Sequence, residues 1–357
     1  MKTKYFTWLC TILSFLLLSC EKEFDPRDKY KDITIVYGLI NPLESIHYIR
    51  ICRAFYAPES VTIVAQNPDS LYYPVEDIDV RVYEITPTGN STPLEVGTTI
   101  IHAKDTTGYF YAKEQRVYYF NKKFHIQHLE NTIKIEIEHK KSGKIVYAET
   151  PLVNDFEVII PRSGARPNLN PNPQQAVTKF EWNNAKNGRI YDIYYIMYYK
   201  EGHIDKPLSA WEKDSVVWHV GSHSAPKTGD GEVQPEVLRF NSATFYDQVQ
   251  KKVAYNDSLR RRPYVQAKTT IWSGSEVLYH YHNVNGHPTP LPEVPEYTNL
   301  KTTLNSVELE NEAFGIFTSR IAQQIHIFLS DHMMMSYLPN VELVNRQFIP
   351  VPIIVDE

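Results

Sequence analysis

Apolar and polar side chains alternate with a period of two along much of the chain after residue 31. The clearest stretch is 133–138, where Ile133, Ile135 and Ile137 alternate with charged residues. Successive side chains of a strand point to opposite faces, so this pattern predicts a strand with one buried face and one wet face. Similar patterns predict further strands at 33–37, 46–56, 78–82, 145–148, 264–272, 276–282 and 325–329.

Strands and turns of this kind recur between residues 32 and 153. At 33–37, Ile33, Ile35 and Tyr37 alternate with the two residues between them. The segment 141–144 reads Lys-Ser-Gly-Lys and predicts a hairpin turn. These features predict a β-sandwich over residues 32–153.

The second half opens with a proline-rich segment at 161–173, which predicts a loop or linker because proline cannot sit in a central strand. A tryptophan-bearing strand follows at 180–182, then a polar turn at 183–189 and an apolar run at 191–199. This order resembles the second and third strands of fibronectin type III domains, whose aromatic residues pack between two sheets.

One helix is predicted near 242–256. Asn241 or Ser242 can cap its start, and Phe245, Val249 and Val253 repeat every four residues. The 25 tyrosines and 23 prolines of the 357-residue chain favour β structure with many turns. The predicted class is therefore mainly β, with two β-sandwich domains at 32–153 and 154–357. We expect the second to be fibronectin type III-like, with one or two short helices in all.

The N-terminus carries a targeting signal. Lys2 and Lys4 precede an apolar run that is too short to span a bilayer, and Ser19 comes directly before Cys20. This arrangement resembles the lipobox of bacterial lipoproteins. The resemblance implies a signal peptide at 1–19 and acyl chains on Cys20, which hold the protein in the lipid bilayer. A single membrane-spanning anchor is the alternative.

Residues 20–31 are expected to form a polar tether. The acidic residues directly after Cys20 look like the surface-export signal of Bacteroidetes-type lipoproteins, which implies an outer-membrane protein exposed at the cell surface. The alternatives are the periplasmic face of that membrane and a tether with no export signal.

Charge and cysteine content exclude some classes. The full chain has a net charge of −5 and no long basic run, which argues against nucleic acid as a partner. Besides Cys20, only Cys52 would remain after processing, so no intrachain disulfide is expected. Cys52 falls in an apolar strand pattern, which predicts a buried thiol.

Candidate chemistry is sparse. His280 and His282 would share one face of a strand and could then ligate a metal, but no acidic or cysteine partner has a defined spacing. His219 and His223 are a weaker pair, and Met333–Met335 beside a histidine predict packing at a turn, with one methionine near the surface. Aromatic clusters at 72–74 and 118–120 are candidates for stacking on sugars, or else core residues. No motif of a catalytic nucleophile is present, so we expect no enzyme activity and no cofactor.

Several short motifs occur together in one order along the mature chain. The lipobox precedes Ile35–Ile40, Val75–Val82, Gly108-Tyr109, Ser142–Thr150, Phe180–Trp182, the helix near 242, Tyr297–Leu300 and Gly315–Ser319. This set resembles domain of unknown function 4249, a family of Bacteroidetes-type outer-membrane lipoproteins. The chain departs from the family in a longer interval between Asn299 and Gly315. The resemblance implies no catalytic residue and an accessory role beside TonB-dependent receptors.

Three functions are thus open. The first is a non-catalytic binding or accessory lipoprotein of a TonB-dependent uptake system, with an unknown ligand. The second is a structural or adhesive surface protein similar to an accessory pilin, for which the apolar tail 347–355 could add to a sheet edge, although its two prolines limit pairing. The third is a hydrolase whose site is assembled only in space.

Overall fold

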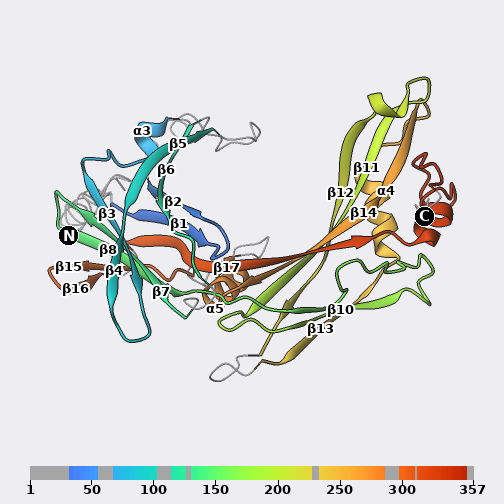
Figure 1. The fold of residues 1–357 in the computed structure, drawn as a ribbon. Helices are drawn as coiled ribbons and strands as arrows, with labels where there is room; N and C mark the ends of the chain where they lie inside the picture. The colour runs from blue at the N-terminus through green and yellow to red at the C-terminus, as the bar shows by residue number, and fades with distance from the viewer. Residues whose placement is uncertain are drawn as a thin grey trace, which may run out of the picture. The chain divides into compact units, whose positions relative to one another are not determined.

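The computed structural model describes residues 32–54, 67–102, 114–125, 130–226, 233–285, 297–309 and 312–351. Strands dominate these residues and helices are few, which confirms the mainly β class (Figure 1). The expected signal peptide, Cys20 and the tether lie outside the described residues. No helix in the described ranges is long and apolar enough to cross a membrane.

The largest sheet has eight strands in the order β12-β11-β14-β17-β1-β2-β6-β5. Their bounds are β1 (Thr34–Ile40), β2 (Ile46–Arg53), β5 (Val96–His102), β6 (Glu114–Asn121), β11 (Ile190–His203), β12 (Glu212–Ser224), β14 (Leu259–Gly274) and β17 (Ala313–Phe328). Neighbours in this sheet are antiparallel except β1 and β17, which run parallel.

Two smaller sheets accompany it. A six-stranded sheet has the order β16-β15-β8-β7-β3-β4, and a three-stranded sheet has the order β13-β10-β9. The bounds of these strands are β3 (Ile78–Ile85), β4 (Ser91–Leu94), β7 (Thr132–His139), β8 (Lys144–Pro151), β9 (Val158–Ile160), β10 (Val177–Asn183), β13 (Pro235–Asn241), β15 (Lys301–Leu304) and β16 (Val307–Leu309).

Strand β17 joins the two halves of the large sheet. Its first part, Ala313–Ser319, pairs in parallel with β1, and its second part, Arg320–Phe328, pairs with β14. Just before it in the chain, β15 pairs with β8 of the six-stranded sheet. A segment from the end of the chain therefore completes the sheets that the first strands begin (Figure 1).

The buried apolar residues form two main clusters. One contains Ile133, Ile135 and Ile137, all fully buried, together with residues of β1, β2, β6, β8 and β17. The other contains Trp182 and Phe245, with residues of β11, β12, β14, β17 and the C-terminal segment. At about 25 cal/mol per Å² of apolar surface, burial of these side chains is the main favourable contribution to folding.

The parallel pairing of β1 with β17 depends on close contacts at two glycines. Gly315 has φ +99°, and a Cβ added to it would lie 2.1 Å from the backbone oxygen of Val36. A Cβ on Gly38 would lie 2.6 Å from the ring of Phe317. Only glycine allows both the backbone angle at 315 and this close approach of the strands.

The free edge of β17 is completed by a side chain. The Asn299 amide donates to the carbonyl of Phe317 at 2.7 Å, and the amide group of Phe317 donates to Asn299 Oδ1 at 3.0 Å. The pairing with β14 begins only at Arg320, so Asn299 bonds backbone groups that no strand reaches.

The helices are short. They are α3 (Pro68–Leu71), α4 (Thr244–Lys252), α5 (Glu276–Asn285) and a π-helix at Met333–Tyr337. The predicted helix at 242–256 is present as α4, which buries Phe245, Tyr246 and Val249.

Two sequence predictions are wrong. The segment 276–282 is helical rather than extended, because α5 starts at Glu276, directly after Ser275, whose hydroxyl accepts a bond from the amide of Leu278 at 3.3 Å. In β1 the buried face is formed by Thr34, Val36 and Ile40, whereas Tyr37 is exposed. Both faces of this strand are apolar, so alternation alone does not show which one enters the core.

Candidate functional site

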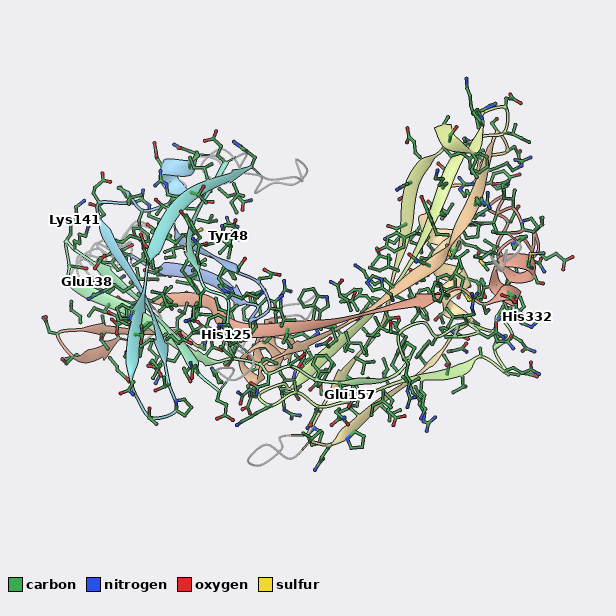
Figure 2. The ribbon with its side chains drawn as sticks, viewed as in Figure 1. Tyr48, His125, Glu138, Lys141, Glu157 and His332 are labelled. Carbon is green, nitrogen blue, oxygen red and sulfur yellow. The ribbon has the colours of Figure 1, made fainter. Side chains whose placement is uncertain are left out.

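The outer face of β1 and β2, opposite the core, carries large apolar side chains in contact with solvent. Tyr37 is 42% exposed, Leu39 37%, Ile46 42% and Tyr48 47%. Tyr48 is labelled in Figure 2 among the side chains of this part of the sheet. We call these four residues the β1–β2 patch. Contiguous exposed apolar surface of this kind marks sites of contact with other molecules.

The β1–β2 patch continues across the sheet into β6. Tyr48 pairs with Tyr119, and the centroids of their rings are 6.5 Å apart. The Tyr119 ring in turn covers Gly97 of β5, where an added Cβ would lie 2.7 Å from the ring. Regular strands therefore hold these side chains in a fixed row, which is a preorganised surface for binding.

A second region is a cavity of about 330 Å³ that opens between β11, β12, β14 and β17. We call it the lysine–tyrosine cavity. This volume is at the lower end of the range for small-molecule sites. The polar side chains that line it are Tyr198, Lys213, Asp214, Tyr264, Gln266, Lys268, Gln324 and His326.

A bulge in β14 shapes this cavity. Met197 of β11 pairs with Ala267, but Tyr199 pairs with Pro263, so the three residues 264–266 of β14 lie opposite Tyr198 alone and β14 carries two extra residues. Such a bulge re-aims the side chains that it carries. Here it brings Tyr264 and Gln266 into the cavity wall.

The charges around the lysine–tyrosine cavity are not balanced. Lys213 lies opposite Lys200 on the neighbouring strand, and neither Lys213 nor Lys268 forms an ion pair with a described residue. The one carboxylate in the wall, Asp214, accepts bonds from the hydroxyl of Tyr199 at 2.8 Å and from the amide of Ser215 at 2.7 Å. Like charges on adjacent strands repel each other, so this part of the sheet favours an anion.

A larger cavity of about 510 Å³ lies beside β9 and β17. Its two carboxylates already have partners within the chain: Asp155 bonds Gln323, and Glu157 accepts from Asn183 at 3.2 Å. Satisfied polar groups gain little from a ligand, so this cavity is the weaker candidate.

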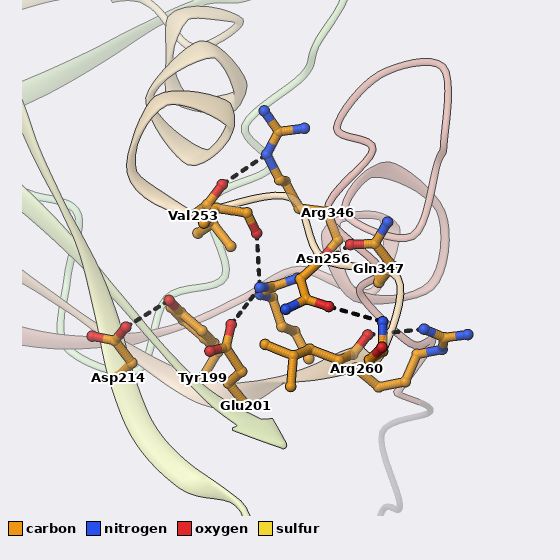
Figure 3. Close-up of polar contacts among 12 residues, drawn as sticks. Tyr199, Glu201, Asp214, Val253, Asn256, Arg260, Arg346 and Gln347 are labelled. Atoms are coloured by element: carbon orange, nitrogen blue, oxygen red, sulfur yellow. Dashed lines mark hydrogen bonds and ion pairs between the residues drawn. The ribbon is translucent and has the colours of Figure 1, made fainter. Parts of the chain in front are cut away.

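The most buried charged group of the described chain has a structural role. Arg261 is 1% exposed, and its guanidinium pairs with Glu201 at 2.5 Å (Figure 3). It also donates to the carbonyls of Ala254 at 2.8 Å and Arg346 at 2.9 Å. These bonds tie the C-terminal segment to the sheet and leave no surface for a ligand.

The C-terminal tail adds to a sheet edge of its own chain. Phe348 forms a parallel bridge with Arg261 of β14, and Phe348 and Val351 are both buried. The remaining residues of the apolar tail, 352–355, lie outside the described ones.

The predicted histidine pair does not form a metal site. His280 and His282 lie on α5, where residues two positions apart point to different sides. His280 lies 3.6 Å from Glu276, one turn earlier on the helix. Within the described ranges, no group of three or more histidine, cysteine or acidic residues is placed to hold a metal ion.

The second histidine pair is split between two acidic partners. His223 bonds Glu236 at 2.6 Å, and His219 lies 3.4 Å from both Asp192 and Ser222. A catalytic triad needs the serine and the acid on different ring nitrogens. Both Asp192 and Ser222 face Nε2 of His219, and the serine hydroxyl donates directly to Asp192 at 2.5 Å. This geometry does not activate the serine.

The predicted aromatic clusters are buried rather than available for sugars. Tyr72, Tyr73, Tyr118 and Phe120 are all less than 10% exposed. Tyr118 and Phe120 point inward from β6, and Tyr72 and Tyr73 lie in the segment directly after α3. Tyr119, between Tyr118 and Phe120 on β6, is half-buried on the opposite face beside Tyr48.

Two further predictions, on Cys52 and on the three methionines, are confirmed. Cys52 is a buried free thiol, and burial raises its pKa. Met333 and Met334 are buried, and Met335 is exposed as expected.

Sequence reasoning missed both surface regions. The signal that points to the lysine–tyrosine cavity is the run 191–199, which is apolar and aromatic on both faces, so one face had to lie outside the core. Comparison of the chain with protein-family models and with curated proteins found no match.

Proposed function

We propose that this chain is a non-catalytic binding or accessory protein held in the outer membrane by acyl chains on Cys20. The exposed β1–β2 patch is the observation that carries the binding role, because Tyr37, Leu39 and Tyr48 stay exposed on regular strands. The absence of nucleophile motifs and the geometry around His219 support a role without catalysis.

The proposed anchor rests on the sequence. Cys20 follows a charged start, an apolar run and a small residue, which is the order that a lipoprotein signal requires. Three acyl chains exceed the two signals needed for stable membrane attachment. We propose display on the cell surface, with the acidic residues after Cys20 as the export signal.

The proposed architecture is two β-sandwich domains, the second of them fibronectin type III-like. Two apolar clusters, one around Ile135 and one around Trp182, support two cores. We propose that the chain is a member of the family of domain of unknown function 4249, on the resemblance of its ordered motifs. In the motifs of this resemblance, Gly38 and Gly315 allow the close contact between β1 and β17, and Asn299 bonds the free edge of β17.

The proposed partner is a TonB-dependent receptor of the outer membrane, and the β1–β2 patch is the surface that contacts it. The test is copurification of the full chain, tagged at its C-terminus, from the outer membrane of its own cells in mild detergent. We expect a β-barrel receptor in the eluate. A monodisperse chain with no receptor would contradict the proposal.

Two variants test whether the β1–β2 patch is the surface that contacts the receptor. Leu39→Asp and Tyr48→Asp place a charge in the β1–β2 patch and should abolish copurification. Both side chains are exposed, so the thermal stability should change little. Thr98→Asp on the exposed face of β5 is the matched control and should copurify normally.

A further inference from the structure

We propose that the lysine–tyrosine cavity binds a small sugar-like molecule that carries a carboxylate, sulfate or phosphate group. This inference rests on the proposed function, since it names the ligand of a binding protein. It concerns the cavity between β11, β12, β14 and β17, which is separate from the β1–β2 patch.

The charge of the ligand follows from the lysines. Lys213 and Lys268 line the cavity without a carboxylate partner among the described residues. Lys200 lies opposite Lys213 on β11 but outside the cavity wall, and its ammonium donates to the carbonyl of Leu208 at 3.3 Å. Asp214 accepts hydrogen bonds from the hydroxyl of Tyr199 and from the backbone amide of Ser215. An anion between the ammonium groups would relieve their repulsion and form charge-assisted hydrogen bonds. The chain as a whole is acidic, so this local excess of positive charge is specific to the site.

The other polar residues of the cavity wall indicate that the ligand carries hydroxyl groups. The hydroxyl of Tyr264 is buried and has no hydrogen-bond partner among the described residues, and its side chain lies in the wall between this cavity and a neighbouring one of about 220 Å³. An unpartnered buried hydroxyl costs about 1–3 kcal/mol, and a ligand hydroxyl within reach would restore the bond. Gln266 and Gln324 offer both donors and acceptors, which suits a molecule with several hydroxyl groups.

The aromatic residues of the cavity wall indicate that the ligand contains a ring. Tyr198 and Tyr264 come from adjacent strands and give the cavity flat apolar surfaces among its polar groups. A pyranose ring has apolar C–H faces and a polar rim, so it matches such a wall. A cavity of about 330 Å³ takes a molecule of monosaccharide size rather than a long chain.

The test is isothermal titration calorimetry of the full chain in detergent with four probes. These are glucuronate, glucose 6-sulfate, glucose 6-phosphate and uncharged glucose. We expect at least one acidic sugar to bind, and glucose to bind more weakly by tenfold or more. The affinity should fall as salt is raised. The three acidic probes distinguish carboxylate, sulfate and phosphate.

Variants assign the binding to the cavity. Lys213→Gln and Lys268→Gln should each lower the affinity for the acidic sugar about tenfold, which is the loss expected for one charge-assisted hydrogen bond. Tyr264→Phe should weaken binding without lowering the melting temperature, because the hydroxyl has no partner in the chain itself. Lys301→Gln on β15 makes the same charge change away from the cavity and should bind normally.

Three results would overturn the inference, and the first two are no binding of any acidic sugar and equal binding of glucose and its acidic derivatives. The third is that the Lys213→Gln and Lys268→Gln variants bind the acidic sugar as tightly as the unchanged chain does. Copurification of a receptor is measured separately, so a receptor without sugar binding would reject the ligand and keep the proposed function. Conversion of a probe into a product would reject the non-catalytic role instead.

Discussion

The side-chain amide of Asn299 bonds both backbone groups of Phe317, in the way a neighbouring strand would. Asn299→Ala removes both bonds and leaves an amide and a carbonyl of β17 without a partner. We expect a loss of about 2 kcal/mol or more in the free energy of unfolding. Urea denaturation of the full chain measures this loss.

Asn299→Asp is the informative companion variant. Its carboxylate can still accept from the amide of Phe317, but it offers no donor and faces the Phe317 carbonyl. It should be as unstable as Asn299→Ala or more so at neutral pH. Stability equal to that of the unchanged chain would show that the Phe317 carbonyl does not need the Asn299 donor.

Gly315→Ala should be among the most damaging single substitutions in the chain. The new Cβ would lie 2.1 Å from the oxygen of Val36, and φ is +99°. A strained backbone and a steric overlap act together, so we expect more than about 3 kcal/mol of destabilisation. Gly89→Ala separates the two effects, because Gly89 has φ +86° and no atom within 4 Å of the added Cβ. Its cost should be about 1 kcal/mol.

Arg261→Met should release the C-terminal segment. The substitution removes the ion pair with Glu201 and the bonds to Ala254 and Arg346. Loss of one partner of a buried pair costs about 3–5 kcal/mol. Hydrogen exchange should accelerate first in residues 345–351. Arg260→Met, one position away and bonded only to nearby carbonyls, is the control and should leave exchange in this segment unchanged.

His47 should make the protein less stable in mild acid. Its Nε2 donates to the Lys122 carbonyl at 2.8 Å, and its Nδ1 is buried without a partner among the described residues. Burial lowers the pKa of His47 below the ordinary value of 6.5. The unfolded chain therefore binds the proton more readily, so stability is unaffected well above that pH and falls as the pH drops below about 6.5.

Chemical denaturation between pH 7.5 and pH 5 measures the contribution of His47. His47→Gln keeps a donor for Lys122 but does not titrate, so its stability should depend less on pH. An identical pH dependence in both proteins would assign the effect to other groups.

Local patterns predicted those strands whose two faces differ in polarity. Ile133, Ile135 and Ile137 are fully buried because charged residues between them fix the inner face. In β1 the exposed face holds Tyr37 and Leu39, so the pattern shows a strand but not its orientation. The same ambiguity hid the β1–β2 patch, since an apolar residue on a surface is indistinguishable from a core residue in sequence.

Other features depend on contacts between distant segments. The parallel pairing of Thr34 with Ala313 leaves no local signal, although it requires glycine at position 315, where an added Cβ would meet the backbone of Val36. The helix α5 carried a local signal, because Ser275 and Glu276 are typical of a helix start. The lysine–tyrosine cavity depends on a bulge in β14, which pairing registers reveal and residue types do not.

The placement of β17 has a consequence for how the protein is made. Ala313–Phe328 contributes to both apolar clusters, and it is synthesised long after β1, with which it pairs. Neither core is complete until it arrives, so the first strands wait for most of the chain to be synthesised. If the chain is exported as we propose, this late completion of its cores keeps it unfolded for long enough to pass through a translocation channel.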